Sequence, residues 1–409
     1  MIVDNDFGKL LATLSESYLQ KEDVANADYY YREYHNQQKT NCRIDPGNIQ
    51  YKEKLANAHE FLGNIALKHG KYAKAFQEYN AMRILFASLK NRFPGELHFI
   101  NGLAVACSKL GDTLAGKGDH VMSRHYYFEF YVLAESFYNA DKETIESAIL
   151  LAGATERMGR VYEDDDQFET ALEYYKKYNE LAARLHKEHP AHAEIKSRLG
   201  NSFHLIGNVY FELNETGKAF DYFMKFFNII KELCLKYPAH PPFLEALSVA
   251  IDKLAIVKIR QNEFSMAVSI LEVALAHAKD ICDQYPQNDE YINGLAIVYE
   301  RLGRVHILME QYHVALKYVN ISRRLTTKLH ISYPAKWTYT NNLGLAYRHA
   351  GNLYFIMNFY TKALYCFNKM RVLSEQLCAL DPQRKDFKQN LETAIKKIAE
   401  TEAILVTPK

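Results

Sequence analysis

Cysteine and histidine residues, which can bind metals or act as nucleophiles, recur at one spacing in this chain of 409 residues. Six of them are separated by 48 residues or by multiples of 48: Cys42, His186, Cys234, Cys282, His330 and Cys378. Elements that repeat with such a period stack about 10 Å apart, whereas zinc needs ligands within ~2.3 Å and a disulfide needs Cα atoms within ~7 Å. We therefore interpret these residues as packing near helix ends, and we expect no metal and no cofactor.

Other arrangements that carry chemistry are missing from the sequence. We find no glycine-rich phosphate loop after a strand, no recognisable Cys/His nucleophile motif and no helical His-Glu-x-x-His zinc signature. The acidic run from Glu163 to Asp166 falls on an expected turn, where carboxylates stay solvated, and we assign it no metal. We expect no catalytic residues and no enzyme activity.

Proline and glycine residues show that the chain is a repeat array. Seven of the ten prolines lie 48 or, once, 96 residues apart: Pro46, Pro94, Pro190, Pro238, Pro286, Pro334 and Pro382. A second series keeps the same spacing, with only Ala255 interrupting it: Gly63, Gly111, Gly159, Gly207, Gly303 and Gly351. Stacked repeats build a long surface rather than one enclosed pocket, so this period favours binding over catalysis.

Each repeat is expected to be a pair of helices. An apolar-periodic stretch from about Tyr51 to His69 precedes Gly70, and a second one runs from Tyr72 to Phe93 and is followed by Pro94. The residues at the break are Glu22, Gly70, Gly118, Asp166, Asn214, Asn262, Glu310 and Asn358. Six of these are Gly, Asn or Asp, which tolerate the left-handed conformation that ends a helix, and the proline stops the second helix. The breaks at the two glutamates are inferred from register alone.

Small and large residues follow the glycine at fixed distances. A small residue twelve positions later permits close packing, and four residues further stands a large one: Tyr79, Tyr127, Tyr175, Phe223, Leu271, Val319 and Phe367. With Leu62, Gly63, Tyr72, Ala75 and Tyr79, this order resembles the tetratricopeptide repeat, whose usual unit of 34 residues is extended here to 48. The resemblance implies an all-α fold, a right-handed α-α superhelix of about eight long helix pairs with a C-terminal capping helix.

The repeat divides the whole chain, residues 1–409, into one array. Its units are approximately 1–46, 47–94, 95–142, 143–190, 191–238, 239–286, 287–334 and 335–382, with a capping helix at 383–406. The third unit lacks the closing proline, and its second helix is rich in aromatic residues: Tyr126, Tyr127, Phe128, Phe130, Tyr131, Phe137 and Tyr138. These residues either pack a continuous or differently capped joint, or form an exposed patch for a homodimer.

Charge and hydropathy limit the partners. Lys and Arg number 50 against 49 Asp and Glu, without a basic stripe, so we expect no nucleic-acid partner. The sequence has no basic leader before an apolar run and nowhere 18 consecutive apolar residues, so we expect a cytoplasmic protein that is not in a membrane.

The resemblance also indicates where a ligand would bind, because in that family the first helices line the concave face. Three residues before the glycine stand Ala12, Glu60, Ser108, Glu156, His204, Asp252, Glu300 and Arg348, and one after it stand Glu16, Asn64, Asp112, Arg160, Asn208, Ile256, Arg304 and Asn352. The groove residues singled out are Glu60, Asn64, Glu156, Arg160, His204, Asn208, Phe211, Asp252, Glu300, Arg304, Arg348 and Asn352. The asparagines could bind a peptide backbone or merely cap or solvate a polar face.

The charges of this face suggest a type of partner. Most of its carboxylates precede Arg304 and Arg348, so a partner with a basic segment and an acidic end would fit, unless the charges form only a solvated face. The family's clamp for a chaperone carboxylate is not supported, because Glu60 stands where that clamp needs lysine.

These observations predict a non-catalytic scaffold or adaptor that binds a protein or an extended peptide along its concave face. Long units of this kind look like those of bacterial signalling arrays, which are often joined to protease or kinase domains, and we find no such domain in this sequence. Two alternatives stay open: a regulatory or sensor subunit of a separate effector enzyme, and an intracellular receptor for signalling peptides.

Overall fold

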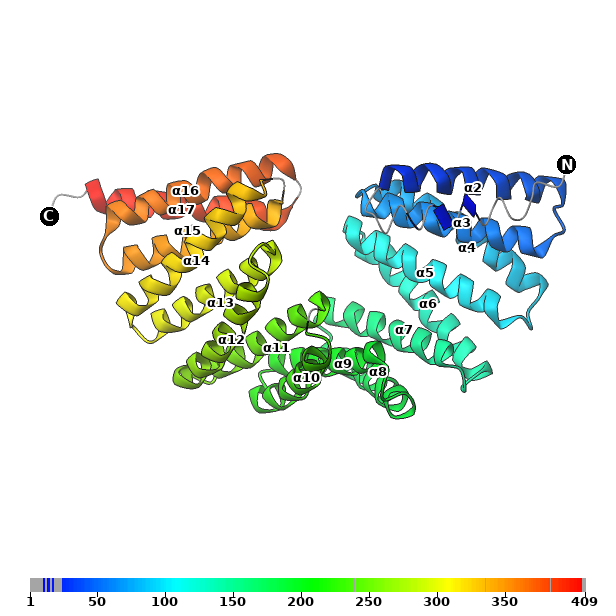
Figure 1. Cartoon of the computed structure of the whole chain (residues 1–409), viewed down its shortest axis with the longest axis horizontal. Helices are drawn as coiled ribbons and strands as arrows, with labels where there is room; N and C mark the ends of the chain where they lie inside the picture. The colour runs from blue at the N-terminus through cyan, green and yellow to red at the C-terminus, as the bar shows by residue number, and fades with distance from the viewer. Residues whose placement is uncertain are drawn as a thin grey trace. The chain divides into compact units, whose positions relative to one another are not determined.

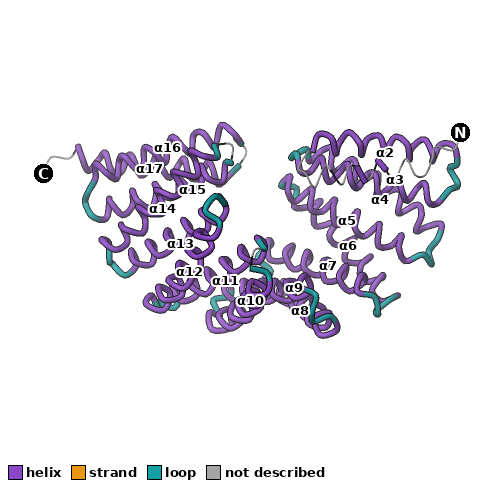
Figure 2. The backbone as a smooth tube through the Cα atoms, in the orientation of Figure 1, coloured by secondary structure: helices purple, strands orange, loops and turns teal. Residues whose placement is uncertain are grey.

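The structure is a computed structural model of the whole chain. It describes residues 10, 11, 13, 14, 17, 24–238, 240–334, 336–382 and 384–406. These residues form sixteen helices and no strand, which confirms the all-α prediction. Figure 2 shows the helices with the loops that connect them. The groove positions Ala12 and Glu16 and the break at Glu22 lie outside the described residues.

The chain separates into two compact units at Leu213 and Asn214. The first contains α2 (Val24–Ile44), α3 (Ile49–Lys68), α4 (Tyr72–Arg92), α5 (Leu97–Lys117), α6 (His120–Ala140), α7 (Ile145–Asp164), α8 (Phe168–Glu188) and α9 (Ala193–Glu212). The second contains α10 (Thr216–Lys236), α11 (Pro241–Arg260), α12 (Phe264–Gln284), α13 (Asp289–Leu308), α14 (Tyr312–Ser332), α15 (Trp337–Ile356), α16 (Tyr360–Leu380) and α17 (Lys385–Val406). Within each unit, consecutive helices pack against each other, as can be followed in Figure 1.

The turn inside each repeat has the same backbone conformation. The residue at the break has positive φ in all seven described cases: Gly70 (68°), Gly118 (86°), Asp166 (59°), Asn214 (60°), Asn262 (60°), Glu310 (59°) and Asn358 (62°). In six of these turns the N–H of this residue and that of the next one bond to carbonyls in the last turn of the helix, for example Gly70 N to Leu67 O and Lys71 N to Ala66 O, both at 2.9 Å. This left-handed cap confirms the break inferred from register at Glu310.

The prolines follow the second helices as expected. Helix α4 ends at Arg92, two residues before Pro94, and the other prolines of the series stand in the same relation to their helices. The third repeat, which lacks the proline, does not continue into the next helix. Helix α6 ends at Ala140, and the Ser147 hydroxyl at the start of α7 bonds to Asp141 O at 2.5 Å and Thr144 O at 3.0 Å. The joint is therefore differently capped.

The glycine series marks the closest approach of the two helices of a repeat. A Cβ atom on Gly63 would lie 2.5 Å from the Tyr79 ring, and one on Gly111 would lie 2.5 Å from the Tyr127 ring. The same contact joins Gly159 to Tyr175, Gly303 to Val319 and Gly351 to Phe367. The large residue sixteen positions after the glycine thus packs on the glycine itself, which explains why both positions share one period.

The aromatic residues of the third repeat mostly fill the core. Tyr126, Tyr127, Phe130 and Phe137 are buried, and Phe128 is 56% exposed. Phe130 and Phe137 belong to a cluster shared by α3 to α7. An exposed patch built from the whole series is therefore absent, and only part of α6 offers apolar side chains to solvent.

We predict that the non-glycine residue Glu310 strains its turn. Replacement with glycine should raise the free energy of unfolding by about 0.5–1 kcal/mol, because glycine adopts positive φ without a Cβ penalty. Glu272→Gly in α12, an exposed helix-interior position, should instead lower it by about 1 kcal/mol. Urea unfolding followed by circular dichroism compares the variants, and a loss of stability in Glu310→Gly would contradict the strain.

Two glycines of α7 provide a matched test of the close approach. Gly159→Ala should destabilise the protein by about 1–3 kcal/mol, because the new methyl group overlaps the Tyr175 ring. Gly153→Ala, which meets no atom within 4 Å, should stabilise it by up to about 1 kcal/mol through helix propensity. Equal melting temperatures for the two variants would show that Gly159 does not hold the helices together.

Candidate functional site

Polar side chains on the first helices connect successive repeats. In the first unit, Lys109 Nζ donates to Asn64 Oδ1 at 3.0 Å, and the guanidinium of Arg157 donates to both oxygens of Asp112 at 3.0 and 3.3 Å. Each acceptor also binds the tyrosine that packs on the glycine, Tyr79 at 2.8 Å and Tyr127 at 2.7 Å. Asn64 thus holds helices together instead of standing free in a groove.

The second unit has an equivalent connection between its first helices. Arg301 forms an ion pair with Asp252, and His349 Nδ1 lies 2.8 Å from Glu300 Oε1. The basic partners of these pairs, in both units, all stand two residues before the glycine position. Our sequence reasoning missed this position, although its period was visible in the sequence: Lys109, Arg157, Lys253, Arg301, His349 and Lys397. We call these contacts the inter-repeat ladder.

Several predicted groove residues are engaged with their own helix. Glu156 is buried, and its Oε1 accepts from Arg160 Nη2 at 2.9 Å. Asn208 Nδ2 lies 3.3 Å from His204 Nε2. Burial raises the pKa of Glu60, and the charge of Lys109 opposes this only in part. Burial and mutual contacts thus limit what these side chains of the first unit can offer to a ligand.

The positive charges of two arginines in the second unit are less well balanced by acidic side chains. Arg304 extends into solvent, with a side chain 62% exposed, and lies 3.7 Å from Glu300. Arg348 is half-buried and has no hydrogen-bond or ion-pair partner in the described part of the chain. Its pKa is lowered by burial and by the charge of Arg304, although Glu300 opposes the shift. Arg304, Arg348 and the adjacent half-buried Asn352 form what we call the arginine cluster.

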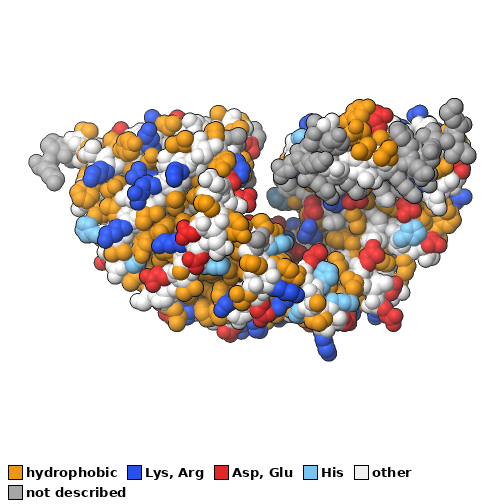
Figure 3. Space-filling model, in the orientation of Figure 1, with side chains coloured by type: hydrophobic (Ala, Val, Ile, Leu, Met, Phe, Trp, Pro, Cys, Tyr) orange, Lys and Arg blue, Asp and Glu red, His pale blue; other side chains and the backbone are white. Residues whose placement is uncertain are grey.

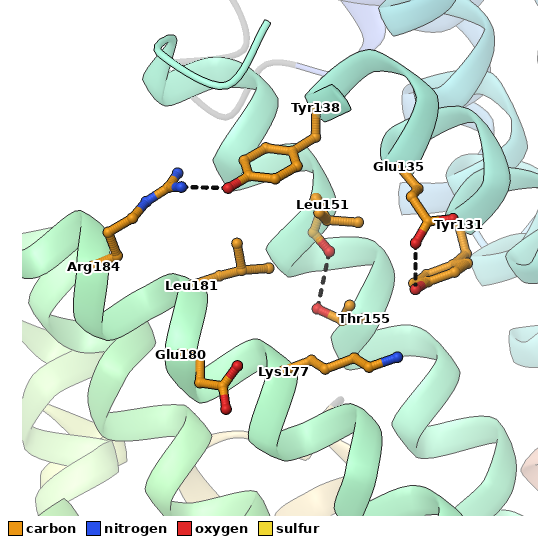
Figure 4. A pocket seen from close by; sticks show the side chains of 9 residues that line it. All are labelled: Tyr131, Glu135, Tyr138, Leu151, Thr155, Lys177, Glu180, Leu181 and Arg184. Atoms are coloured by element: carbon orange, nitrogen blue, oxygen red, sulfur yellow. Dashed lines mark hydrogen bonds between the residues drawn. The ribbon is translucent and has the colours of Figure 1, made fainter. Parts of the chain in front are cut away.

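A pocket of about 340 Å³ lies in the first unit, among α6, α7 and α8. Figure 4 shows Leu151 and Leu181 in the centre, between Tyr131 and Glu135 of α6 and the charged residues of α8. Tyr131 donates a hydrogen bond to Glu135 at 3.0 Å, and Arg184 donates to the Tyr138 hydroxyl. Tyr131 and Tyr138 were named in the sequence analysis only as part of a possible homodimer patch, and none of the other lining residues was singled out for binding.

A pair of histidines joins α2, α3 and α4. The rings of His35 and His59 are 4.6 Å apart, and His59 Nδ1 lies 2.8 Å from Glu78 Oε2. Burial and the charge of His59 lower the pKa of His35. Burial alone would raise the pKa of Glu78, but the hydrogen bond and charges of the histidines outweigh it, so that pKa is lowered.

Other kinds of site can be checked among the same residues. Within the described ranges, no three or more His, Cys, Asp or Glu side chains are grouped so as to hold a metal ion, and the six cysteines are free. None of the described helices has the length and apolarity needed to span a bilayer. On the face shown in Figure 3, several Lys and Arg side chains lie over the C-terminal helices among apolar and uncharged ones, and elsewhere side chains of both signs are mixed.

Comparison with known proteins concerns the fold. The sequence matches no family model, and no curated protein matches it. Its structure is similar to the apo quorum sensor NprR from B. thuringiensis, with 13% identity, 91% of this chain and 89% of that chain covered, and a TM-score of 0.57. Apo RapI is 12% identical, with coverage of 97% and 98% and a TM-score of 0.52. The fold is tetratricopeptide-like.

A third similar structure has a lower score. Aspartyl phosphate phosphatase F from Bacillus subtilis is 13% identical, with 98% of this chain and 95% of that chain covered and a TM-score of 0.47.

In the tetratricopeptide-like array of this chain, the signature glycine and aromatic residues make the helix-pair contact, while the first helices carry both the ladder and the arginine cluster.

The histidine pair predicts a pH dependence of stability. The pKa of His35 is lower in the folded protein than its ordinary value of 6.5. As the pH drops from 7 to 5, the unfolded chain therefore binds more protons at this residue than the folded protein does, and stability should fall. His35→Gln should remove part of this loss, about 1.4 kcal/mol for each unit of pKa difference, whereas exposed His69→Gln should not. Parallel stability curves of His35→Gln and wild type, measured with urea at each pH, would refute this assignment.

Proposed function

We propose that this protein is a non-catalytic binding module that holds a protein or an extended peptide on the face formed by its first helices. The observation that carries the proposal is the arginine cluster. Arg348 is partly desolvated beside Arg304 and has no ion-pair partner in the part of the chain that the structure describes, and such an arrangement is unfavourable until an anion binds. The planar guanidinium matches a carboxylate, so we assign the cluster to a carboxylate of the ligand.

The neighbouring groups support a peptide as the source of this carboxylate. Asn352 is half-buried, one turn after Arg348 on α15, and its amide can both donate to and accept from a peptide backbone. Since many predicted groove residues of the first unit already contact each other, we place the charged anchor of the ligand on the second unit. Glu60, His204 and Phe211 stay candidates for contacts elsewhere on the first helices.

The biological role that we propose is that of a cytoplasmic scaffold or adaptor. We also propose that the two units belong to a single repeat array. A sensor is our second candidate, because the quorum sensor NprR shares the fold. In that case the bound partner would be a signalling peptide, or the chain would regulate a separate protease or kinase. A ligand-dependent change in the radius of gyration favours the sensor, and an unchanged radius with two partners bound together favours the scaffold. We also propose that the chain forms a homodimer through its third repeat.

The ligand proposal predicts that binding depends on a free carboxylate and on Arg348. Random pentapeptides with free C-termini and their amidated counterparts are incubated with the protein, and retained peptides are identified by mass spectrometry. The free-acid library should yield retained peptides, and Arg348→Gln should weaken their binding by about tenfold or more, because a hydrogen bond between charged groups contributes about 1.5–3 kcal/mol.

The matched control is Arg324→Gln, an exposed arginine on α14 of the same unit, which should bind as the wild type does. Arg348→Gln should also unfold at the same or higher temperature, because it removes a partly buried charge that lacks a partner. Equal retention of free and amidated peptides, or equal loss in both variants, would refute the carboxylate site.

A further inference from the structure

The second helix of the third repeat exposes three apolar side chains on one face, and at one of these positions, that of Phe128, the other repeats are mainly polar. Phe128 is 56% exposed, Val121 79% and Val132 48%, and spacings of seven and eleven residues put all three on one face of α6. The residues in the place of Phe128 in other repeats are Asn80, Lys176, Met224, Glu272, Asn320 and Asn368. The turns and core contacts of the third repeat do not need these apolar residues, so an additional partner explains them best.

The pocket of Figure 4 adjoins this face, because Tyr131, Glu135 and Tyr138 continue along the same helix. Its centre is apolar, with buried Leu151 and half-buried Leu181. At about 340 Å³ it has room for one aromatic side chain. An exposed ring and an apolar pocket that could receive such a ring thus lie a few residues apart on one surface.

The charges around the pocket are of both signs. On α8, Lys177 is exposed and its Nζ lies 5.3 Å from the centre of the Tyr174 ring, while exposed Glu180 has no hydrogen-bond or ion-pair partner among the described residues. When a charged surface pairs with a copy of itself, the patch has to carry both signs, since each charge must find its opposite after a two-fold rotation. A partner of a single charge would leave one of the two unmatched.

We propose that this surface binds a second copy of the chain, with Phe128 of each copy in the pocket of the other. The inference rests on the proposed self-association and specifies its contacts. Residues one repeat apart lie at the same level along their helices. A two-fold axis that lies between the two copies, perpendicular to the helices and near Tyr131 of α6, therefore also passes close to Asn179 of α8. This axis sets α6 antiparallel to α6 of the other copy. It brings Phe128 of one copy to a level between Tyr131 and Tyr138 of the other.

The same axis arranges the charges of α8. Rotation about a level near residue 179 exchanges positions 177 and 180, so Lys177 of each copy faces Glu180 of the other. The apolar and the charged contacts therefore require one and the same symmetry axis. Because the interface is isologous, it predicts a closed dimer and no larger oligomer.

Sedimentation velocity of the full chain over a range of concentrations tests the proposal. The wild type should form a dimer, and Phe128→Lys should raise its dissociation constant at least tenfold. Val273→Lys on α12 is the matched control, because Val273 is also exposed, at 65%, but belongs to the second unit and not to this surface, and it should dimerise as the wild type does. Circular dichroism establishes that each variant is folded.

A charge exchange tests the symmetry itself. Lys177→Glu should weaken the dimer, because the new carboxylate of one copy would face Glu180 of the other. The double variant Lys177→Glu with Glu180→Lys should restore it. A wild type that stays monomeric at its highest soluble concentration overturns both the self-association and this interface. A dimer that tolerates Phe128→Lys, or that the double variant fails to restore, overturns the interface alone.

Discussion

The packing of one large side chain on one glycine sets the distance between the two helices of a repeat. The Tyr79 ring on Gly63 shows the contact in its simplest form, and a methyl group on the glycine would overlap the ring. Because the helices touch at this point, the left-handed turn at Gly70 can connect them directly, and the next helix pair can stack on the resulting layer. Each unit is built from such layers, and the register of every other side chain depends on them.

The polar contacts use the same layers. The Tyr79 hydroxyl lies beside the glycine contact and bonds to Asn64, which also accepts from Lys109 of the next repeat. One side chain thus connects the packing inside a repeat to the packing between repeats. In the second unit the ladder leaves Arg348 without an ion pair among the described residues, and this difference between the units is the physical basis for placing the carboxylate site there.

The two proposed interfaces lie on different helices and use different chemistry. The arginine cluster is carried by first helices and offers charge and amide groups, whereas the surface around Phe128 is carried mainly by second helices and offers apolar area. A repeat array can separate functions in this way because its first and second helices present separate faces. A self-association through second helices would leave the first helices open to a ligand.

The sequence by itself determined the repeat, the helix pairs and their turns. The 48-residue period predicted the helix breaks, including the one at Glu310, but the left-handed conformation of this glutamate came only from the structure. A turn between packed helices needs positive φ there even when the residue does not favour it. The same period could have revealed the basic position two residues before the glycine, a signal that our reading overlooked.

Only the tertiary structure decided which groove residues are available to a ligand. Sequence offsets placed Asn64, Asp112 and Arg348 on the same face, yet the first two bind side chains of other helices and the third has no partner among the described residues. A partner depends on which side chain of another helix reaches the same point, and this is a property of packing between residues 15 to 49 positions apart. The aromatic residues of the third repeat illustrate the same limit, because their spacing showed a helix, and only packing separated exposed Phe128 from its buried neighbours.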